Sequence, residues 1–242
     1  MSDTRTRGLR PAWALFRREL NSFFQTPIAY VVGVVFLVAL ALLFFSVFFL
    51  NDRAQMRQFF GLLPLLLALL MPALAMRVIA EERRRGMQEI MSTLPLRNTE
   101  MVLAKFAAVW VTGLFLLAPT IIFTISASFV GQLDPGPVVS GYLGAILLVA
   151  VYGAVGVFAS SVSPNETVAL VTGLVISLVF ALLNQFLVLF PGSIVSFMEF
   201  LSTGYHYQGF TRGIIDSRSI IYLVTLTVFF LVLTRYQLDR QR

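Results

Sequence analysis

Six long apolar segments constrain the fold of this chain more than any other feature of its sequence. A helix that crosses the hydrocarbon core of a bilayer needs about 20 apolar residues, and its backbone polar groups must all be bonded within the element. Uninterrupted apolar runs do not fit the alternating strands of a membrane barrel. The sequence therefore predicts an all-α integral membrane protein with six transmembrane helices. These cover residues 28–50, 59–79, 102–130, 139–161, 167–190 and 219–235.

Composition supports one membrane domain over residues 1–242. The chain is 58% hydrophobic, whereas about 45–50% is usual for a soluble domain. Outside the spans it has a tail with an interfacial helix (1–27), a charged segment (80–101) and an outer segment (191–218). The net charge of +6 comes from basic residues beside apolar spans, which favours lipid headgroups as partners over nucleic acid.

The distribution of basic residues predicts the orientation. If the N-terminus is cytoplasmic, all but four of the 18 Lys and Arg residues lie on the cytoplasmic side. The four outside are Arg53, Arg57, Arg212 and Arg218. Because cytoplasmic loops carry the excess of Lys and Arg, both termini are predicted to be cytoplasmic.

Three connections carry local signals. Helical spacing of apolar residues before the first span predicts an interfacial helix, either a leading anchor or an elbow that contacts a partner. The outer segment is too apolar for a simple loop and predicts a short helix that dips into the outer leaflet. The stretch 163–166 matches a capping box with proline at the first helical position. The apolar residues of the interfacial helix are Trp13, Phe16, Leu20 and Phe23. Those of the outer segment are Ile194, Val195, Phe197, Met198 and Leu201.

The fifth span carries small residues at every fourth position. Such a row lets another helix approach closely, either within the chain or across a dimer seam or pathway, and packing within the chain is favoured. Two amides near its outer end would be costly in lipid, so they should face protein or water. The residues are Ala169, Gly173, Ser177 and Ala181, followed by Asn184 and Gln185.

The charged segment contains the stretch EERRRGMQEIMSTLP at residues 81–95. After Gly86, four apolar residues recur at i, i+3, i+4 and i+7 until Pro95, which predicts an amphipathic helix of about two turns. The helix either rests on headgroups, which the periodicity alone favours, or places its methionine-rich face in the groove of another protein. The four residues are Met87, Ile90, Met91 and Leu94.

Several chemistries lack the residues they need. The predicted helix cores contain no ionisable side chain, which disfavours a proton-driven transporter, although backbone-coordinated sodium stays open. Lys105 is the only lysine, and its setting LAKFAA is no phosphate loop, so the chain cannot hydrolyse nucleotide by itself. The only histidine, His206, has no cysteine or carboxylate partners and is expected to be solvated or interfacial. We predict no catalytic residue and no metal site.

The order of these features resembles the permease subunits of ABC-2 type transporters. The similarity rests on the pattern E-E-R-x-x-G-x-x-E-x-x-x-x-x-P followed by a lysine that opens the third helix. Two stretches, RELNSFFQTPIAYVV at 18–32 and YHYQGFTRGIIDSRSIIYL at 205–223, resemble the branch of gliding-motility-associated and copper-enzyme-maturation permeases. The residues that carry the pattern are Glu81, Glu82, Arg83, Gly86, Glu89, Pro95 and Lys105.

The resemblance implies a division of labour in a bacterial inner membrane. Two copies of a cytoplasmic ABC ATPase would bind ATP and magnesium, and this chain would bind no cofactor. A second permease chain, identical or different, would complete a dimer, and export is the commoner direction in the family. Residues 81–95 would be the coupling helix, with the four apolar residues inserted in the ATPase and the charges paired with it or with headgroups. The implied interface is Glu81, Glu82, Arg83, Arg84, Arg85, Gly86, Met87, Glu89, Ile90, Met91, Leu94 and Pro95.

Two other functions remain open from the residues alone. A membrane anchor or scaffold would recruit a cytoplasmic protein without moving a solute. An autonomous channel would conduct when it is reconstituted alone. An intramembrane hydrolase is the least favoured reading, because the sequence offers no nucleophile with a partner.

Overall fold

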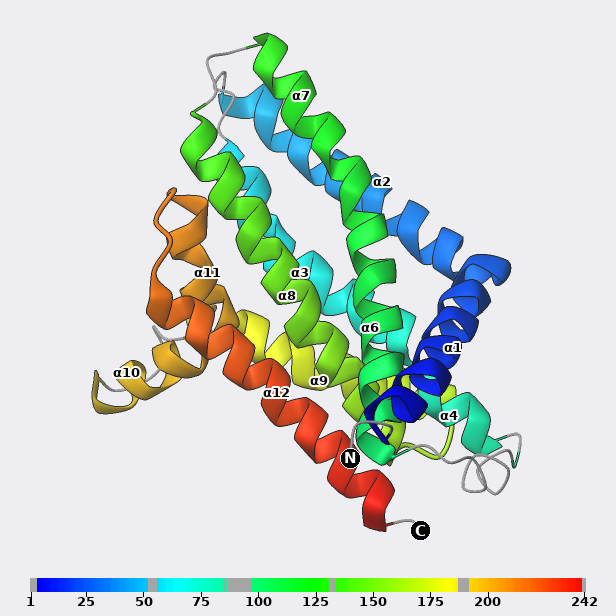
Figure 1. Cartoon of the computed structure of the whole chain (residues 1–242). Helices are drawn as coiled ribbons and strands as arrows, with labels where there is room; N and C mark the ends of the chain where they lie inside the picture. The colour runs from blue at the N-terminus through cyan, green and yellow to red at the C-terminus, as the bar shows by residue number, and fades with distance from the viewer. Residues whose placement is uncertain are drawn as a thin grey trace.

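The computed structural model describes residues 4–51, 56–84, 86, 97–130, 134–186 and 192–240 (Figure 1). Every regular element in these ranges is a helix. Two of them, η1 and η2, are short 3₁₀ turns. The elements are α1 (Thr4–Gln25), α2 (Pro27–Asn51), α3 (Met56–Ala75), α4 (Arg77–Arg84), α6 (Asn98–Leu117), η1 (Ala118–Thr120), α7 (Ile121–Val130), α8 (Pro135–Val162), α9 (Glu166–Leu182), η2 (Leu183–Gln185), α10 (Gly192–Leu201), α11 (Thr203–Thr211) and α12 (Ser217–Arg240).

The helices confirm an all-α integral membrane protein. In the described ranges, five helices are long and apolar enough to cross a membrane, and a bent pair from α1 and α2 makes a sixth if it is counted as one span. The two parts of that pair, Ala12–Gln25 and Ala29–Phe44, meet at 65°. Three of the five join neighbouring elements: Met56–Arg84 joins α3 and α4, Asn98–Phe129 joins α6, η1 and α7, and Glu166–Gln185 joins α9 and η2. The other two, Pro135–Val162 and Ser217–Arg240, are α8 and α12.

The N-terminal helix α1 packs along α6 rather than standing apart from the bundle (Figure 1). Leu15 is buried in this contact, although the sequence pattern did not single it out. Trp13, on the predicted apolar face, is 60% exposed and stacks on Phe16 with ring centroids 5.1 Å apart. The helix was predicted, and its packing against α6 was not.

Helix α8 is the centre of the bundle. Of its most apolar stretch of 18 residues, 72% is buried, compared with 22% of the corresponding stretch of α9 and 28% of that of α12. Helix α8 packs against α3, α6, α9, α11 and α12. Close approach depends on glycine. A Cβ atom on Gly144 would lie 2.7 Å from the ring of Tyr207, and one on Gly156 would lie 2.6 Å from the Cβ of Ala75. The neighbours of α8 occupy the space that side chains at these positions would need.

A serine from α8 fixes the junction between α3 and α4. The first backbone N–H groups of a helix have no partner within it. In α4, the N–H groups of Ile79 and Ala80 each donate to Ser160 Oγ at 3.0 Å, and this hydroxyl donates to the carbonyl of Met76 at 2.9 Å. Ser160 therefore caps a helix from outside and sets the direction in which α4 leaves α3.

The hairpin between α8 and α9 forms as predicted, but with a different cap. Asn165 is the residue before α9, and its side-chain oxygen accepts from the N–H of Val168 at 2.9 Å. Ser163 closes α8 instead, and Pro164 precedes the helix rather than opening it. The capping-box prediction placed the helix start two residues too early, because Asn is as good a cap as Ser.

The outer segment holds two helices. A helix was expected near 194–201, and α10 confirms it. The next helix, α11, was not predicted and packs against α3, α8 and α9. Tyr207 and Phe210 are buried there, and the Tyr207 hydroxyl donates to the carbonyl of Gly141 at 3.0 Å. The mixed polar and aromatic sequence of α11 gave no apolar run to detect.

His206 was expected to be solvated or interfacial, and its side chain is buried between α11 and α12. Its Nδ1 lies 3.2 Å from Ser219 Oγ, its Nε2 lies 3.0 Å from the carbonyl oxygen of Phe200, and its ring stacks on Tyr222 with centroids 4.2 Å apart. Burial lowers the pKa of this imidazole. His206 thus joins α11 to α12 as a packing residue.

A substitution at the crowded face of α8 tests this packing. Gly156→Ala places a Cβ 2.6 Å from Ala75 Cβ and 3.2 Å from the backbone of Pro72, so we expect a loss of about 1–3 kcal/mol of stability. Gly61→Ala is the matched control, because no atom lies within 4 Å of its added Cβ. The measurement is the temperature at which half of the detergent-purified protein stays monodisperse. Equal temperatures for the two variants would contradict the packing described.

Candidate functional site

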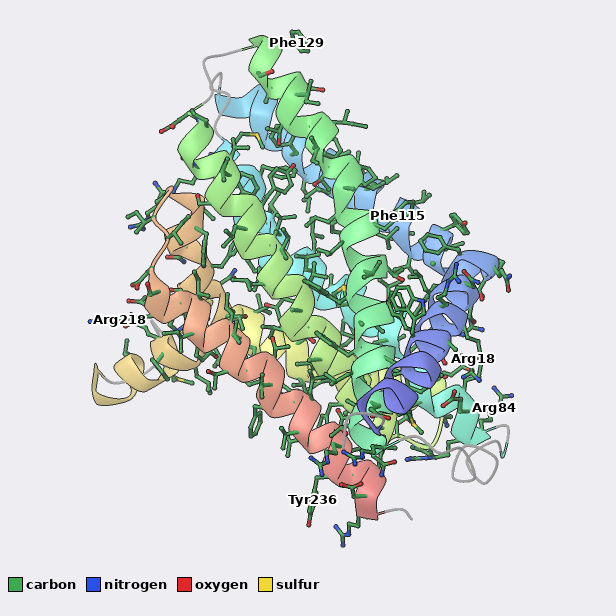
Figure 2. All side chains as sticks on the ribbon, in the orientation of Figure 1. Arg18, Arg84, Phe115, Phe129, Arg218 and Tyr236 are labelled. Atoms are coloured by element: carbon green, nitrogen blue, oxygen red, sulfur yellow. The ribbon has the colours of Figure 1, made fainter. Side chains whose placement is uncertain are left out.

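One end of the bundle, where α4 and α12 end and α6 begins, gathers charged side chains (Figure 2). Figure 2 shows Arg18 of α1 and Arg84 of α4 on this side of the molecule. We call it the charged end. It is also where residues 85–96 leave α4 and return to α6, so the predicted coupling segment is attached here.

The centre of this end is Lys105 of α6. Its side chain is completely buried, and its ammonium lies 2.8 Å from Glu82 Oε2, 3.3 Å from Glu19 Oε1 and 2.6 Å from the carbonyl oxygen of Val78. The ammonium donates hydrogen bonds to Glu19 and to the carbonyl of Val78, and it forms an ion pair with Glu82. A buried charge is tolerated when it is paired and hydrogen-bonded in this way.

Arg18 completes the group on the outer side. Its guanidinium lies 2.8 Å from Glu19 and 3.0 Å from Glu82, and its side chain is 56% exposed. The two carboxylates, 12% and 15% exposed, therefore lie between a buried and an exposed cation. We refer to Arg18, Glu19, Glu82 and Lys105 as the Lys105 cluster. It joins α1, α4 and α6, which are far apart in the sequence.

A second set of contacts ties α4 to the hairpin of α8 and α9. Arg77 pairs with Glu166 at 3.2 Å and with Glu81 at 3.8 Å. Arg83 donates to the carbonyl oxygens of Ser161 at 2.6 Å and Ser163 at 3.1 Å. A cation near these last carbonyls is also favoured by the helix dipole of α8. Helix α4 is thus held from both sides.

The two ends of the predicted coupling segment are both fixed. On the α4 side the helix ends at Arg84, and Gly86 has a φ of 67°, a left-handed conformation that glycine adopts without strain. On the α6 side, the amide of Asn98 donates to Asp239 near the end of α12. The segment therefore starts and finishes at positions that other helices hold.

The structure locates only part of the predicted interface. Glu82 and Arg83, which were expected to pair with an ATPase or with headgroups, form ion pairs and hydrogen bonds with residues of this chain. Glu81 lies 3.8 Å from Arg77, and Arg84 is exposed. The rest of that interface lies outside the described residues, and its role stays a prediction. These residues are Arg85, Met87, Glu89, Ile90, Met91, Leu94 and Pro95.

A groove of about 680 Å³ runs between α1 and α4 beside the Lys105 cluster. Polar side chains of α1, among them Asn21, Ser22 and Gln25, form one wall, and Arg77 and Glu81 contribute to the other. Arg18 and Glu82 bridge the groove at 3.0 Å. An ion pair therefore contributes to the link between α1 and α4.

The small-residue row of α9 faces the interior of the bundle. Ala169, Gly173, Ser177 and Ala181 are its buried residues, and a Cβ on Gly173 would lie 2.9 Å from Pro72 Cβ. The row packs against α3 and α8, in agreement with the favoured interpretation. The opposite face of α9 exposes Val168, Val171, Val175 and Val179. Asn184 and Gln185 lie in η2 and line a separate cleft.

Sequence reasoning missed the partners of Lys105. It recognised the lysine as part of a family pattern and Glu82 as part of the charged segment, but it did not connect either to Glu19. A signal was present, because Glu19 is the only acidic residue of α1 and Lys105 the only lysine of the chain. Among the described residues, no group of three His, Cys, Asp or Glu side chains is arranged to hold a metal ion.

Removing the buried cation tests the Lys105 cluster. Lys105→Met leaves Glu19 and Glu82 without their buried partner, and we expect a loss of about 3 kcal/mol of stability. Adding Glu19→Gln and Glu82→Gln should restore part of it, since the unpaired charges disappear. Thermal unfolding of the detergent-purified chain measures both effects.

The control for this experiment is an exposed ion pair. Arg235 and Asp239 are 56% and 48% exposed and lie 3.4 Å apart, so Arg235→Met should change stability by less than about 0.5–1 kcal/mol. If Lys105→Met were as stable as Arg235→Met, the cluster would contribute nothing to the fold.

Comparison with known proteins identifies the family. A sequence model described as ABC-2 family transporter protein matches residues 51–236, which include every element from α3 to the greater part of α12. A comparison with curated proteins finds no match. The matched region covers most of the chain and includes α4, α6 and α12 of the charged end, whereas α1 lies outside it. The chain belongs to the ABC-2 family of transporter proteins, as a multi-pass membrane component of an ABC transporter.

Proposed function

We propose that this chain is the permease subunit that couples a separate cytoplasmic ATPase to the movement of a substrate, through residues 81–95. The observation that carries the proposal is the attachment of this segment. Its first residues, 81–84, form the end of α4, and α4 is bound by ion pairs and hydrogen bonds to α1, α6 and the hairpin of α8 and α9.

The contacts of α4 offer a route for force. A displacement of the segment moves the end of α4, and the contacts of Arg83 and Arg77 transmit this displacement to the hairpin of α8 and α9. The ion pairs of Glu82 with Lys105 and Arg18 transmit the same displacement to α6 and α1. An ATPase bound there shifts the bundle between two states only if it binds one of them more tightly. The coupling free energy of such pairs of sites is typically about 1–3 kcal/mol.

The proposal includes an orientation and a set of partners. The charged end faces the cytoplasm of a bacterial inner membrane, because most basic residues of the sequence belong to that side. Two ATPase copies bind ATP and magnesium, a second permease chain completes a dimer, and the direction is export. This assignment rests on the family and on the charge distribution.

A double substitution on the predicted apolar face tests the ATPase contact. Ile90→Asp with Leu94→Asp places two charges where the proposal requires apolar contact with the ATPase, so co-purification should fall at least about tenfold. The test uses a P-loop ATPase subunit without membrane spans that is co-expressed with the chain, and we expect a neighbouring reading frame to encode it. Membrane insertion of the variant should be unchanged.

The matched control makes the same change elsewhere. Ile214 and Ile215 are exposed apolar neighbours just after α11, 59% and 51% exposed, and their replacement by aspartate should leave the ATPase bound. Unchanged co-purification of the Ile90 and Leu94 variant would contradict the coupling role. A bound ATPase whose hydrolysis drives no transport in vesicles would support a scaffold, and conduction by the chain alone would support a channel.

A further inference from the structure

A second polar site lies away from the charged end, in a cleft of about 330 Å³. The first turns of α3, the 3₁₀ turn η2 after α9, and α11 enclose it. Its volume lies at the lower end of the range of about 300–1,000 Å³ that ligand sites occupy. It shares no lining residue with the Lys105 cluster or with residues 81–95.

Part of the lining of the cleft is polar and carries one positive charge. Arg57 lies there with the amide side chains of Asn184, Gln185 and Gln208, and the lining contains no Asp or Glu. Arg57 makes no ion pair or hydrogen bond with another residue in the described ranges. A single guanidinium without a neighbouring acid favours an anion, and its planar donors suit phosphate or carboxylate.

The lining also contains apolar residues. These are Pro64, Leu65 and Leu182, and they belong to two of the membrane-spanning helices. A purely hydrophilic molecule would leave these residues without a partner, whereas the first carbons of an acyl chain would cover them. Gly61 also lines the cleft, and a Cβ atom at this position would meet no atom within 4 Å. A larger side chain there would occupy space that the glycine leaves empty.

We propose that this cleft binds the anionic headgroup of an amphiphile. A phosphate pairs with Arg57, and the Gln185 and Gln208 amides donate to its remaining oxygens. The start of an acyl chain lies against Leu65 and Leu182. The proposal does not depend on an ATPase, so it stands or falls separately from the coupling role of residues 81–95.

Lipid binding to the full-length chain tests the proposal. The purified protein in detergent is titrated with phosphatidylglycerol or with phosphatidylcholine of the same acyl chains, and bound lipid is counted by native mass spectrometry. We expect phosphatidylglycerol to bind about tenfold more tightly, since it carries a net negative charge whereas phosphatidylcholine is zwitterionic. Arg57→Gln should remove this preference, and Gly61→Leu should weaken binding of both lipids by filling the cleft.

Arg218→Gln is the control, because Arg218 is exposed on the first turn of α12 and does not line the cleft (Figure 2). It should bind phosphatidylglycerol like the wild type, and all variants should elute as the wild type does in gel filtration. Competition by glycerol 1-phosphate would show that the headgroup alone suffices. Its failure to compete, with phosphatidylglycerol still preferred, would show that the acyl chain is needed. Equal retention of phosphatidylglycerol by Arg57→Gln, Gly61→Leu and Arg218→Gln would overturn the proposal.

Discussion

The burial of a single ammonium group, that of Lys105, organises the charged end of the bundle. Because a charge in such a place must be paired, the side chain brings Glu19 from α1 and Glu82 from α4 to the same point of α6. Either carboxylate alone would leave the group incompletely bonded. The requirement to satisfy one lysine thus determines how the N-terminal helix and the start of the predicted coupling segment meet.

Close helix packing supplies the frame for these charges. Gly144 and Gly156 let aromatic and aliphatic side chains reach the backbone of α8, and Ser160 on the same helix caps α4. Helix α4 therefore takes its direction from α8 and its electrostatic partners from α1 and α6. The membrane-embedded core and the charged end form one continuous set of contacts.

Local patterns in the sequence predicted the features that are themselves local. Apolar length predicted the spans, and four-residue spacing predicted the buried face of α9. Features that depend on distant partners were missed or misplaced. His206 has no local pattern that reveals its stacking on Tyr222, and nothing near Lys105 in the sequence indicates Glu19. Helix α11 was missed because contacts with α3, α8 and α9, rather than its own apolar content, stabilise it.

The bond between Asn98 and Asp239 has a consequence for the C-terminal helix. It ties the last turns of α12 to the first residue of α6, at the point where the chain returns from the charged segment. Helix α12 also packs along α8 over much of its length. Any tilt of α6 at that point must therefore either break this amide–carboxylate contact or carry the C-terminus with it, which makes the end of the chain a natural place for a reporter of conformational state.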